Sequence, residues 1–273
     1  MQQVVENLIK KANEHKHIAP EYTGEDGLLH CSVCNAATQV QVEIFEEKRI
    51  VRCICKCQQA EREAEAERKK REENERARRR CFAEANMSEW NFKNDDRQNP
   101  KISDAMKRYV ENFEAFKADS KGLLLYGSCG TGKTYHAACV ANALIDKGYT
   151  VTMTNFATLI NRLQGMFEGR QEYIERLNRC ALLIIDDLGA ERKTEYMQET
   201  VFNIIDSRYR SGLPLIVTTN LTPEEIKQPQ DVGYQRIYDR ILERCFPVEV
   251  AGTSRRRKEL KDTYSDTKAL LGL

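Results

Sequence analysis

The sequence predicts an α/β protein whose five-stranded parallel sheet is flanked by helices, preceded by a small cysteine-rich module. Three observations support this. After about residue 85, short apolar runs alternate with amphipathic stretches, a glycine-rich loop follows the first of these runs, and five of the ten cysteines lie between Cys31 and Cys57. Buried strands that alternate with helices are typical of a parallel sheet covered on both faces. A chain of 273 residues is long enough for one such core and a small extra module.

The composition limits where the protein acts and what it binds. The net charge is only +1, from 43 Lys and Arg against 42 Asp and Glu, so any contact with nucleic acid must be local. Charges occur throughout the first sixteen residues, and no later stretch has the 18 uncharged apolar residues that a membrane span requires. We therefore expect a soluble, cytoplasmic protein without a membrane partner.

Residues 1–59 are predicted to form a zinc-binding domain. A C-x-x-C pair is followed, after 18 residues, by C-x-C-x-C, which gives five thiols where a tetrahedral Zn²⁺ site needs four. The favoured ligands are Cys31, Cys34, Cys55 and Cys57. Cys53 is the alternative, and His30 is a possible substitute ligand. An iron–sulfur cluster is a less favoured interpretation, and reduced buried cysteines do not explain why so many thiols crowd into one short span.

Residues 60–84 are predicted to form a charged helical linker. The run from Glu61 to Arg80 is rich in helix formers and nearly free of apolar residues, so it offers no face that can anchor a core. Two interpretations stay open. The helix is either a spacer without a partner or a helix whose basic end, Arg78–Arg80, contacts nucleic acid or an acidic protein surface.

Residues 85–273 hold the predicted sheet. Its five strands are expected at 122–127, 149–154, 181–186, 213–219 and 246–250. Helices are expected between them. Gly148 is predicted to end the helix after the first strand, and Gly212 with Pro214 marks the passage into the fourth strand.

A phosphate-binding loop is expected directly after the first strand. The residues GSCGTGKT match G-x-x-x-x-G-K-[ST] in the strand-loop-helix context that the motif needs. The loop residues are Gly127, Ser128, Cys129, Gly130, Thr131, Gly132, Lys133 and Thr134. Glycines let backbone N–H groups approach phosphate closely. The lysine is expected to meet the β- and γ-phosphates of ATP, and the threonine to ligate Mg²⁺. A chance glycine-rich turn is the alternative.

Polar residues at the ends of the third and fourth strands are predicted to complete this site. Asp186 is expected to hold Mg²⁺ and Asp187 to polarise the attacking water, with Glu191 as a weaker candidate for that second role. Solvation of the strand end is the alternative for both aspartates. Asn220 is expected to orient the water if the third and fourth strands are neighbours, and otherwise to be a turn or capping residue.

Together these residues resemble the AAA+ ATPases. The segments LLIIDDLGAE and LIVTTN resemble those of bacterial and phage replicative helicase loaders of the DnaC type and of the related IstB-type transposition helpers. The resemblance covers about residues 85–260. Because only about 23 residues follow the fifth strand, it implies an AAA+ domain without a full helical lid. It also implies ATP hydrolysis and self-association into a ring or spiral.

The resemblance assigns roles to several further residues. In the segment YQRIYDRILE, Arg240 is similar to the arginine finger that acts on a neighbouring subunit's nucleotide, with Arg236 as the alternative. Arg256, or else Arg255, is similar to the second sensor. An ordinary surface ion pair is the alternative for the first two arginines. Loaders contact single-stranded DNA in the region after the second strand, which here holds Phe156, Asn161 and Arg162. An aromatic ring can stack on bases, although a place in the core is the alternative for the phenylalanine.

Cysteine-bearing N-terminal domains occur in loaders of Gram-positive bacteria and their phages, where that end engages the helicase. The resemblance therefore implies an ATP-dependent loader that holds a hexameric replicative DNA helicase through its zinc module and delivers it to single-stranded DNA. Two alternatives stay open. One is an IstB-type transposition helper. The other is a nucleotide-gated adaptor, an alternative that stays open because Asp187 stands where many relatives have Glu. A small-molecule kinase is disfavoured because it has no use for an arginine finger.

Overall fold

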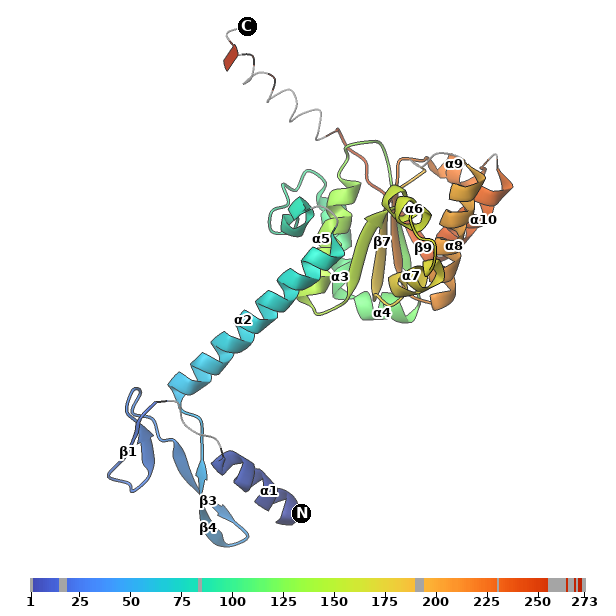
Figure 1. Ribbon diagram of the computed structural model, residues 1–273. Helices are drawn as coiled ribbons and strands as arrows, with labels where there is room; N and C mark the ends of the chain where they lie inside the picture. Colours follow the sequence, from blue (N-terminus) through green and yellow to red (C-terminus); the bar gives the residue numbers. More distant parts are fainter. Residues whose placement is uncertain are drawn as a thin grey trace. The chain divides into compact units, whose positions relative to one another are not determined.

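The structure is a computed structural model that describes residues 2–14, 19–82, 85–189, 194–229 and 231–254, together with Tyr264, Lys268, Leu270 and Leu271. Its contacts divide the chain into two compact units, Met1–Glu73 and Asn74–Leu273. Each unit has its own secondary structure (Figure 1).

The first unit consists of one helix and two hairpins. Its elements are α1 (Gln2–Asn13), β1 (Glu21–Thr23), β2 (Leu29–Cys31), β3 (Gln39–Ile44) and β4 (Glu47–Arg52). Strand β1 pairs with β2 and β3 with β4, both antiparallel. The turn between β3 and β4 consists of Phe45 and Glu46, both at positive φ, as a type I′ hairpin turn requires. Helix α1 contacts β4, where the Asn13 side chain accepts a hydrogen bond of 2.9 Å from the Arg52 backbone.

The charged run between the two units forms a single helix, α2 (Lys56–Cys81). Most of its side chains are exposed, as a sequence without an apolar stripe requires. Its last turns belong to the second unit. There, Arg78 donates hydrogen bonds to Asn142 at 2.9 Å and to Asp146 at 2.5 Å.

A five-stranded parallel sheet forms the centre of the second unit, which confirms the predicted fold class. Its strands are β5 (Gly122–Tyr126), β6 (Val151–Asn155), β7 (Leu182–Leu188), β8 (Leu215–Thr219) and β9 (Cys245–Glu249). The order is β6-β7-β8-β5-β9. All neighbouring strands are parallel, so the carboxyl ends of β5, β7 and β8 meet at one edge. This edge is where open α/β sheets bind ligands.

Helices cover both faces of this sheet. They are α3 (Pro100–Glu111), α4 (Phe113–Ala118), α5 (Lys133–Asp146), α6 (Phe156–Gln164), α7 (Arg170–Leu177), α8 (Glu195–Ser211), α9 (Pro223–Lys227) and α10 (Val232–Arg244), with a 3₁₀ helix at Ala85–Glu89. Figure 1 shows α3 and α5 on one side of the sheet and α6, α7, α8 and α10 on the other. Successive strand side chains point to opposite faces, so Leu123 and Leu125 pack on the α5 side while Leu124 packs on the α8 side. Within the described ranges, no helix is long and apolar enough to cross a bilayer.

Candidate active site and metal centre

The glycine-rich loop connects the end of β5 to the start of α5. Gly130 and Gly132 have φ values of 84° and 97°, a region that residues with a side chain rarely adopt. A Cβ atom on Gly130 would also collide with the side chain of Ser254. Because α5 begins at Lys133, the loop lies at the helix N-terminus, where backbone N–H groups without helical partners attract phosphate.

The Lys133 side chain lies over this loop and joins it to the end of β8. Its Nζ donates hydrogen bonds to the carbonyl oxygens of Gly127 and Ser128, each at 2.9 Å, and to Asn220 Oδ1 at 2.6 Å. Strands β7 and β8 are neighbours, the condition under which Asn220 is expected to join the site. The structure therefore brings Lys133 and Asn220 together at the carboxyl edge of the sheet.

Asp186 follows the buried run of residues 182–185 in β7 and lies between two threonine hydroxyls. Thr134 Oγ1 is 3.0 Å from both carboxylate oxygens, and Thr218 Oγ1 donates to Oδ1 at 2.5 Å. Burial raises the pKa of Asp186 above its ordinary value, and the hydrogen bond from Thr218 opposes this shift. A hydroxyl and a carboxylate at this distance are the oxygen ligands that Mg²⁺ takes beside nucleotide phosphates.

Asp187 follows in an irregular part of β7. Its φ of 57° is unusual for a residue other than glycine, and the pairing of β7 with β8 shifts register between Ile185 and Leu188. The Asp187 backbone N–H donates to Thr218 Oγ1 at 3.0 Å, which holds this conformation. Irregularities of this kind turn a side chain away from its regular direction, and the Asp187 side chain is exposed next to Asp186.

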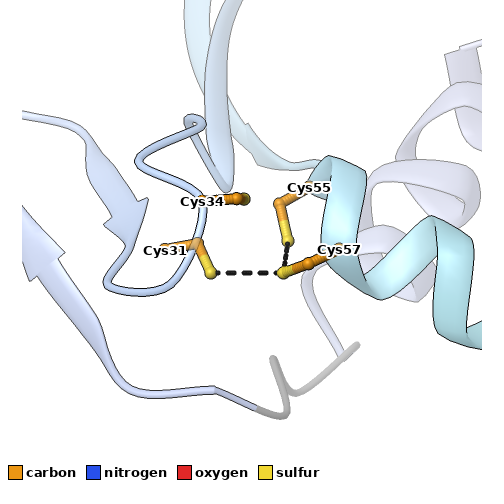
Figure 2. A group of neighbouring side chains, drawn as sticks. All are labelled: Cys31, Cys34, Cys55 and Cys57. Atoms are coloured by element: carbon orange, nitrogen blue, oxygen red, sulfur yellow. Dashed lines mark hydrogen bonds between the residues drawn. The ribbon is translucent and has the colours of Figure 1, made fainter.

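Four cysteines meet in the first unit, at the end of β2 and the start of α2. Their sulfur atoms all lie within 4.8 Å of one another. Figure 2 shows Cys31 and Cys34 on one loop facing Cys55 and Cys57 at the start of the helix. The Sγ atoms of Cys31 and Cys57 are 3.5 Å apart, and those of Cys55 and Cys57 are 3.1 Å apart. Tetrahedral Zn²⁺ with ligands at 2.3 Å separates its sulfurs by about 3.8 Å, so the four thiols fit that ion.

The protonation of these thiols is uneven. Backbone N–H groups of Cys57 and Ala36 lower the pKa of Cys34 to about 6, whereas the neighbouring thiols of Cys55 and Cys31 raise the pKa of Cys57 to about 12. N–H groups directed at sulfur also stabilise the thiolate form that a metal binds.

Two other candidate ligands lie outside this group. Cys53 Sγ donates to the carbonyl oxygen of Ala37 at 3.3 Å. His30 Nε2 lies 3.0 Å from the Asp26 carboxylate, and this contact raises the pKa of His30. Among the described residues, the four sulfurs that converge are therefore those of the favoured ligands.

The arginine-finger candidates lie on α10. Arg240 contacts α8, where its Nε donates to Asp206 Oδ1 at 2.6 Å. Arg236, one turn earlier, is exposed. Arg255 and Arg256, the second-sensor candidates, and Glu191 lie outside the described residues.

The three DNA-contact candidates on α6 differ in exposure. Phe156 is 1% exposed and lies in the core, so the expectation that it contacts DNA is corrected, because a buried ring offers no stacking surface. Asn161 and Arg162 are exposed. The Arg162 guanidinium lies 5.5 Å from the centre of the Tyr173 ring on α7.

A family model described as IstB-like ATP binding protein matches residues 57–263, which is 207 of the 273 residues. The chain belongs to this family. IstB-like proteins are ATP-binding proteins, and the assembled phosphate loop and Asp186 agree with that description.

This IstB-like protein is similar to several proteins from bacteria. The replicative helicase loader DnaI of Bacillus subtilis (strain 168) is 28% identical over 57% of this chain and 52% of its own length. A putative ATP-binding protein in an insertion sequence of Mycobacterium tuberculosis is 27% identical over 65% of this chain and 70% of its own length. The chain thus spans about half the length of the DnaI sequence that it matches.

Solved structures agree on the fold. The crystal structure of DnaI has a TM-score of 0.55 at 26% identity, and the match covers 66% of this chain and 99% of that one. The crystal structure of the DnaC helicase loader has a TM-score of 0.52 at 23% identity, over 62% of this chain and all of that one, and supports the fold alone. The predicted resemblance to helicase loaders and IstB-type proteins is therefore confirmed.

Some residues of the site in this IstB-like chain are not recognisable from motifs. Thr218 holds both Asp186 and the backbone of Asp187. The sequence does give one indication of Thr218, because it is a hydroxyl residue near the end of a predicted strand. Asp206 gives no such signal, because it lies 34 residues before the arginine that it contacts.

Proposed function

We propose that this protein is an ATPase that loads a hexameric replicative DNA helicase onto single-stranded DNA. The observation that carries the ATPase part is a pair of contacts at the start of α5, where Lys133 bonds to Asn220 after β8 and Thr134 bonds to Asp186 on β7. The loader part is supported by the likeness to DnaI and DnaC, which are named replicative helicase loaders.

Each side chain of the site has a distinct task in this proposal. Lys133 leaves the loop carbonyls and moves to the β- and γ-phosphates. Thr134 and Asp186 would hold Mg²⁺, which neutralises charge on the phosphates. Asp187 is exposed and can accept a proton from the attacking water. Once Lys133 has turned to the phosphates, the Asn220 amide is available to orient that water.

The site also requires a neighbouring copy of the chain. Among the described residues, Arg240 contacts α8 and α10 and has no contact with the phosphate loop of its own chain. Its effect on turnover would therefore be exerted on another subunit in a ring or spiral. An arginine finger of this kind can raise the rate by 10³-fold or more.

The first unit is proposed to bind Zn²⁺ through Cys31, Cys34, Cys55 and Cys57 and to hold the helicase. The convergence of four sulfurs within 4.8 Å supports the zinc site. In the second unit, the exposed Asn161 and Arg162 stay candidates for contact with single-stranded DNA.

ATP turnover and helicase co-elution test the proposal together. Turnover is measured with and without single-stranded DNA and a cognate hexameric helicase, for the wild type, Lys133→Ala and Arg240→Ala. Removal of one preorganised charge contact costs on the order of 10²–10³-fold in rate, so Lys133→Ala should lose at least about 100-fold. Lys101→Ala is the matched control, because Lys101 is an exposed lysine on α3, outside the phosphate loop. Turnover by Lys133→Ala at the wild-type rate would contradict the ATPase assignment.

A second candidate function is a transposition helper, which the relative from an insertion sequence favours. The same assays separate it from the loader. Turnover stimulated by DNA without any helicase binding would support the helper. Helicase binding that needs ATP but proceeds without turnover would support the nucleotide-gated adaptor.

A further inference from the structure

The guanidinium of Arg240 is held by several contacts within its own chain. Its Nε donates to Asp206 Oδ1 at 2.6 Å, and its Nη1 donates to the Arg236 carbonyl oxygen at 3.3 Å. Its Cζ lies 4.7 Å from the centre of the Phe202 ring, so the ring covers one face. A planar group that is bound at one edge and stacked on one face has little freedom to rotate.

One nitrogen of this group is left for another partner. Within the described part of the chain, Nη2 of Arg240 makes no hydrogen bond. The side chain is 27% exposed, so a second molecule can reach it. The contacts therefore fix the orientation of the guanidinium while they leave donor groups available at its end.

Asp206 is well suited to fix an arginine in this way. Its side chain is only 12% exposed, and it accepts from Arg240 on one oxygen and from Arg210 on the other, at 2.8 Å. The Arg210 side chain is 76% exposed, so the Arg240 contact is the shielded one. Shielded ion pairs add little net stability but impose a defined geometry.

We propose that Asp206 and Phe202 are positioning residues that aim Arg240 at the γ-phosphate of ATP bound by a neighbouring copy of the chain. This inference rests on the proposed role of Arg240 in trans. A guanidinium that is already oriented stabilises charge in the transition state without first having to reorganise. The competing view is that Asp206 and Arg240 form an ordinary ion pair that attaches α10 to α8.

Mixed assemblies separate these two views. Subunits with Lys133→Ala have a defective nucleotide site but a correctly held Arg240. Subunits with Asp206→Asn have an intact nucleotide site but an Arg240 that is no longer held in position. We expect Asp206→Asn alone to lower kcat on the order of 10²-fold, as a misplaced catalytic group does, without a change in KM. Addition of Lys133→Ala subunits should restore turnover at mixed interfaces. Phe202→Leu should show a smaller loss with the same rescue, and Arg210→Ala, the matched control, should stay within about twofold of the wild type.

The reference mixture combines Arg240→Ala with Lys133→Ala. If Arg240→Ala alone turns over at the wild-type rate, the role of Arg240 itself is wrong. If the reference mixture recovers but Asp206→Asn turns over normally, Arg240 acts without Asp206 and only this inference is overturned. The inference is also overturned if Asp206→Asn is slow and Lys133→Ala subunits do not rescue it, because the defect then lies in the variant's own fold or site.

Discussion

The two units of this chain are held together in different ways. In the second unit, two clusters of apolar side chains fill the space on both faces of the sheet. In the described part of the first unit, no Val, Ile, Leu, Met or Phe side chain is buried. The buried residues there are Cys31, Thr38, Cys55 and Gln58. The cysteines thus occupy the centre that apolar side chains occupy in the second unit. Small domains without an apolar core usually depend on a metal or on cross-links.

The largest expected effect is that of losing one cysteine ligand, which should destabilise the first unit and leave the second unit unchanged. We predict that Cys55→Ser removes bound zinc and unfolds the first unit, because structural zinc contributes about 10 kcal/mol or more to the folding of small zinc domains. The second unit should melt at its usual temperature, since its core is separate. The measurements are zinc per chain by mass spectrometry and amide exchange over residues 21–58 of the full chain.

Cys53→Ser is the control for this change. The Cys53 thiol lies in the same segment but donates to a backbone carbonyl and is not one of the four clustered sulfurs. This variant should keep one zinc per chain. If Cys55→Ser also keeps its zinc, the ligand set is wrong, and visible absorption by the wild type would indicate an iron–sulfur cluster instead.

Thiol reactivity should distinguish cysteines protected by a bound metal from cysteines protected by burial in the apolar core. Burial raises the pKa of Cys81 and of Cys245 to about 12 each, so at pH 8 both should react about 10³-fold more slowly than a thiol of ordinary pKa. A chelator should expose the thiols of the first unit and leave these two unreactive. Alkylation followed by mass spectrometry measures each site, with the exposed Cys129 as the internal reference. Fast labelling of Cys81 in the folded chain would contradict the prediction.

The core of the second unit includes a buried charged side chain, that of Arg208. Arg208 is 1% exposed and donates to the carbonyl oxygens of Pro214, Cys180 and Ala181, at distances from 2.6 to 3.2 Å. Arg208→Leu removes these donors, and we expect a loss of about 3–5 kcal/mol in the free energy of unfolding. Arg210→Ala, at an exposed position two residues on, should cost less than about 1 kcal/mol. Denaturant unfolding of both variants checks this, and equal losses would contradict it.

The fold and the phosphate loop are largely predictable from the sequence, because they depend on local patterns. The five apolar runs predict strands within about two residues of their observed ends. The burial of Phe156 also has a local signal, since Phe156, Leu159, Ile160 and Leu163 follow the helical period of one buried face. Asn161 and Arg162 lie on the opposite face.

Contacts between distant elements are not predictable in this way. The sequence does not state which four of five cysteines converge, because the pairing within the hairpins decides that Cys53 turns to Ala37. It also does not indicate that Asp206 on α8 meets Arg240 on α10, because the partner of a charged residue on a helix depends on how the two helices pack.

The smallest expected effect concerns α2, which over most of its length has neither clustered cysteines nor an apolar core. Lys69 and Glu65 form an exposed ion pair of 2.8 Å at i,i+4, and the hydrogen bond from Lys69 lowers the pKa of Glu65. Glu65→Gln should therefore reduce amide protection near this pair by about twofold or less at neutral pH. A carboxyl whose pKa is lowered on folding stabilises the folded form above its unfolded pKa, so the difference from the wild type should vanish as the pH falls through the lowered pKa of Glu65 in the folded form. Glu67→Gln, at a neighbouring position without an ion pair among the described residues, is the control. A large loss of protection in Glu65→Gln would mean that this stretch of α2 is stabilised by more than its own helical contacts.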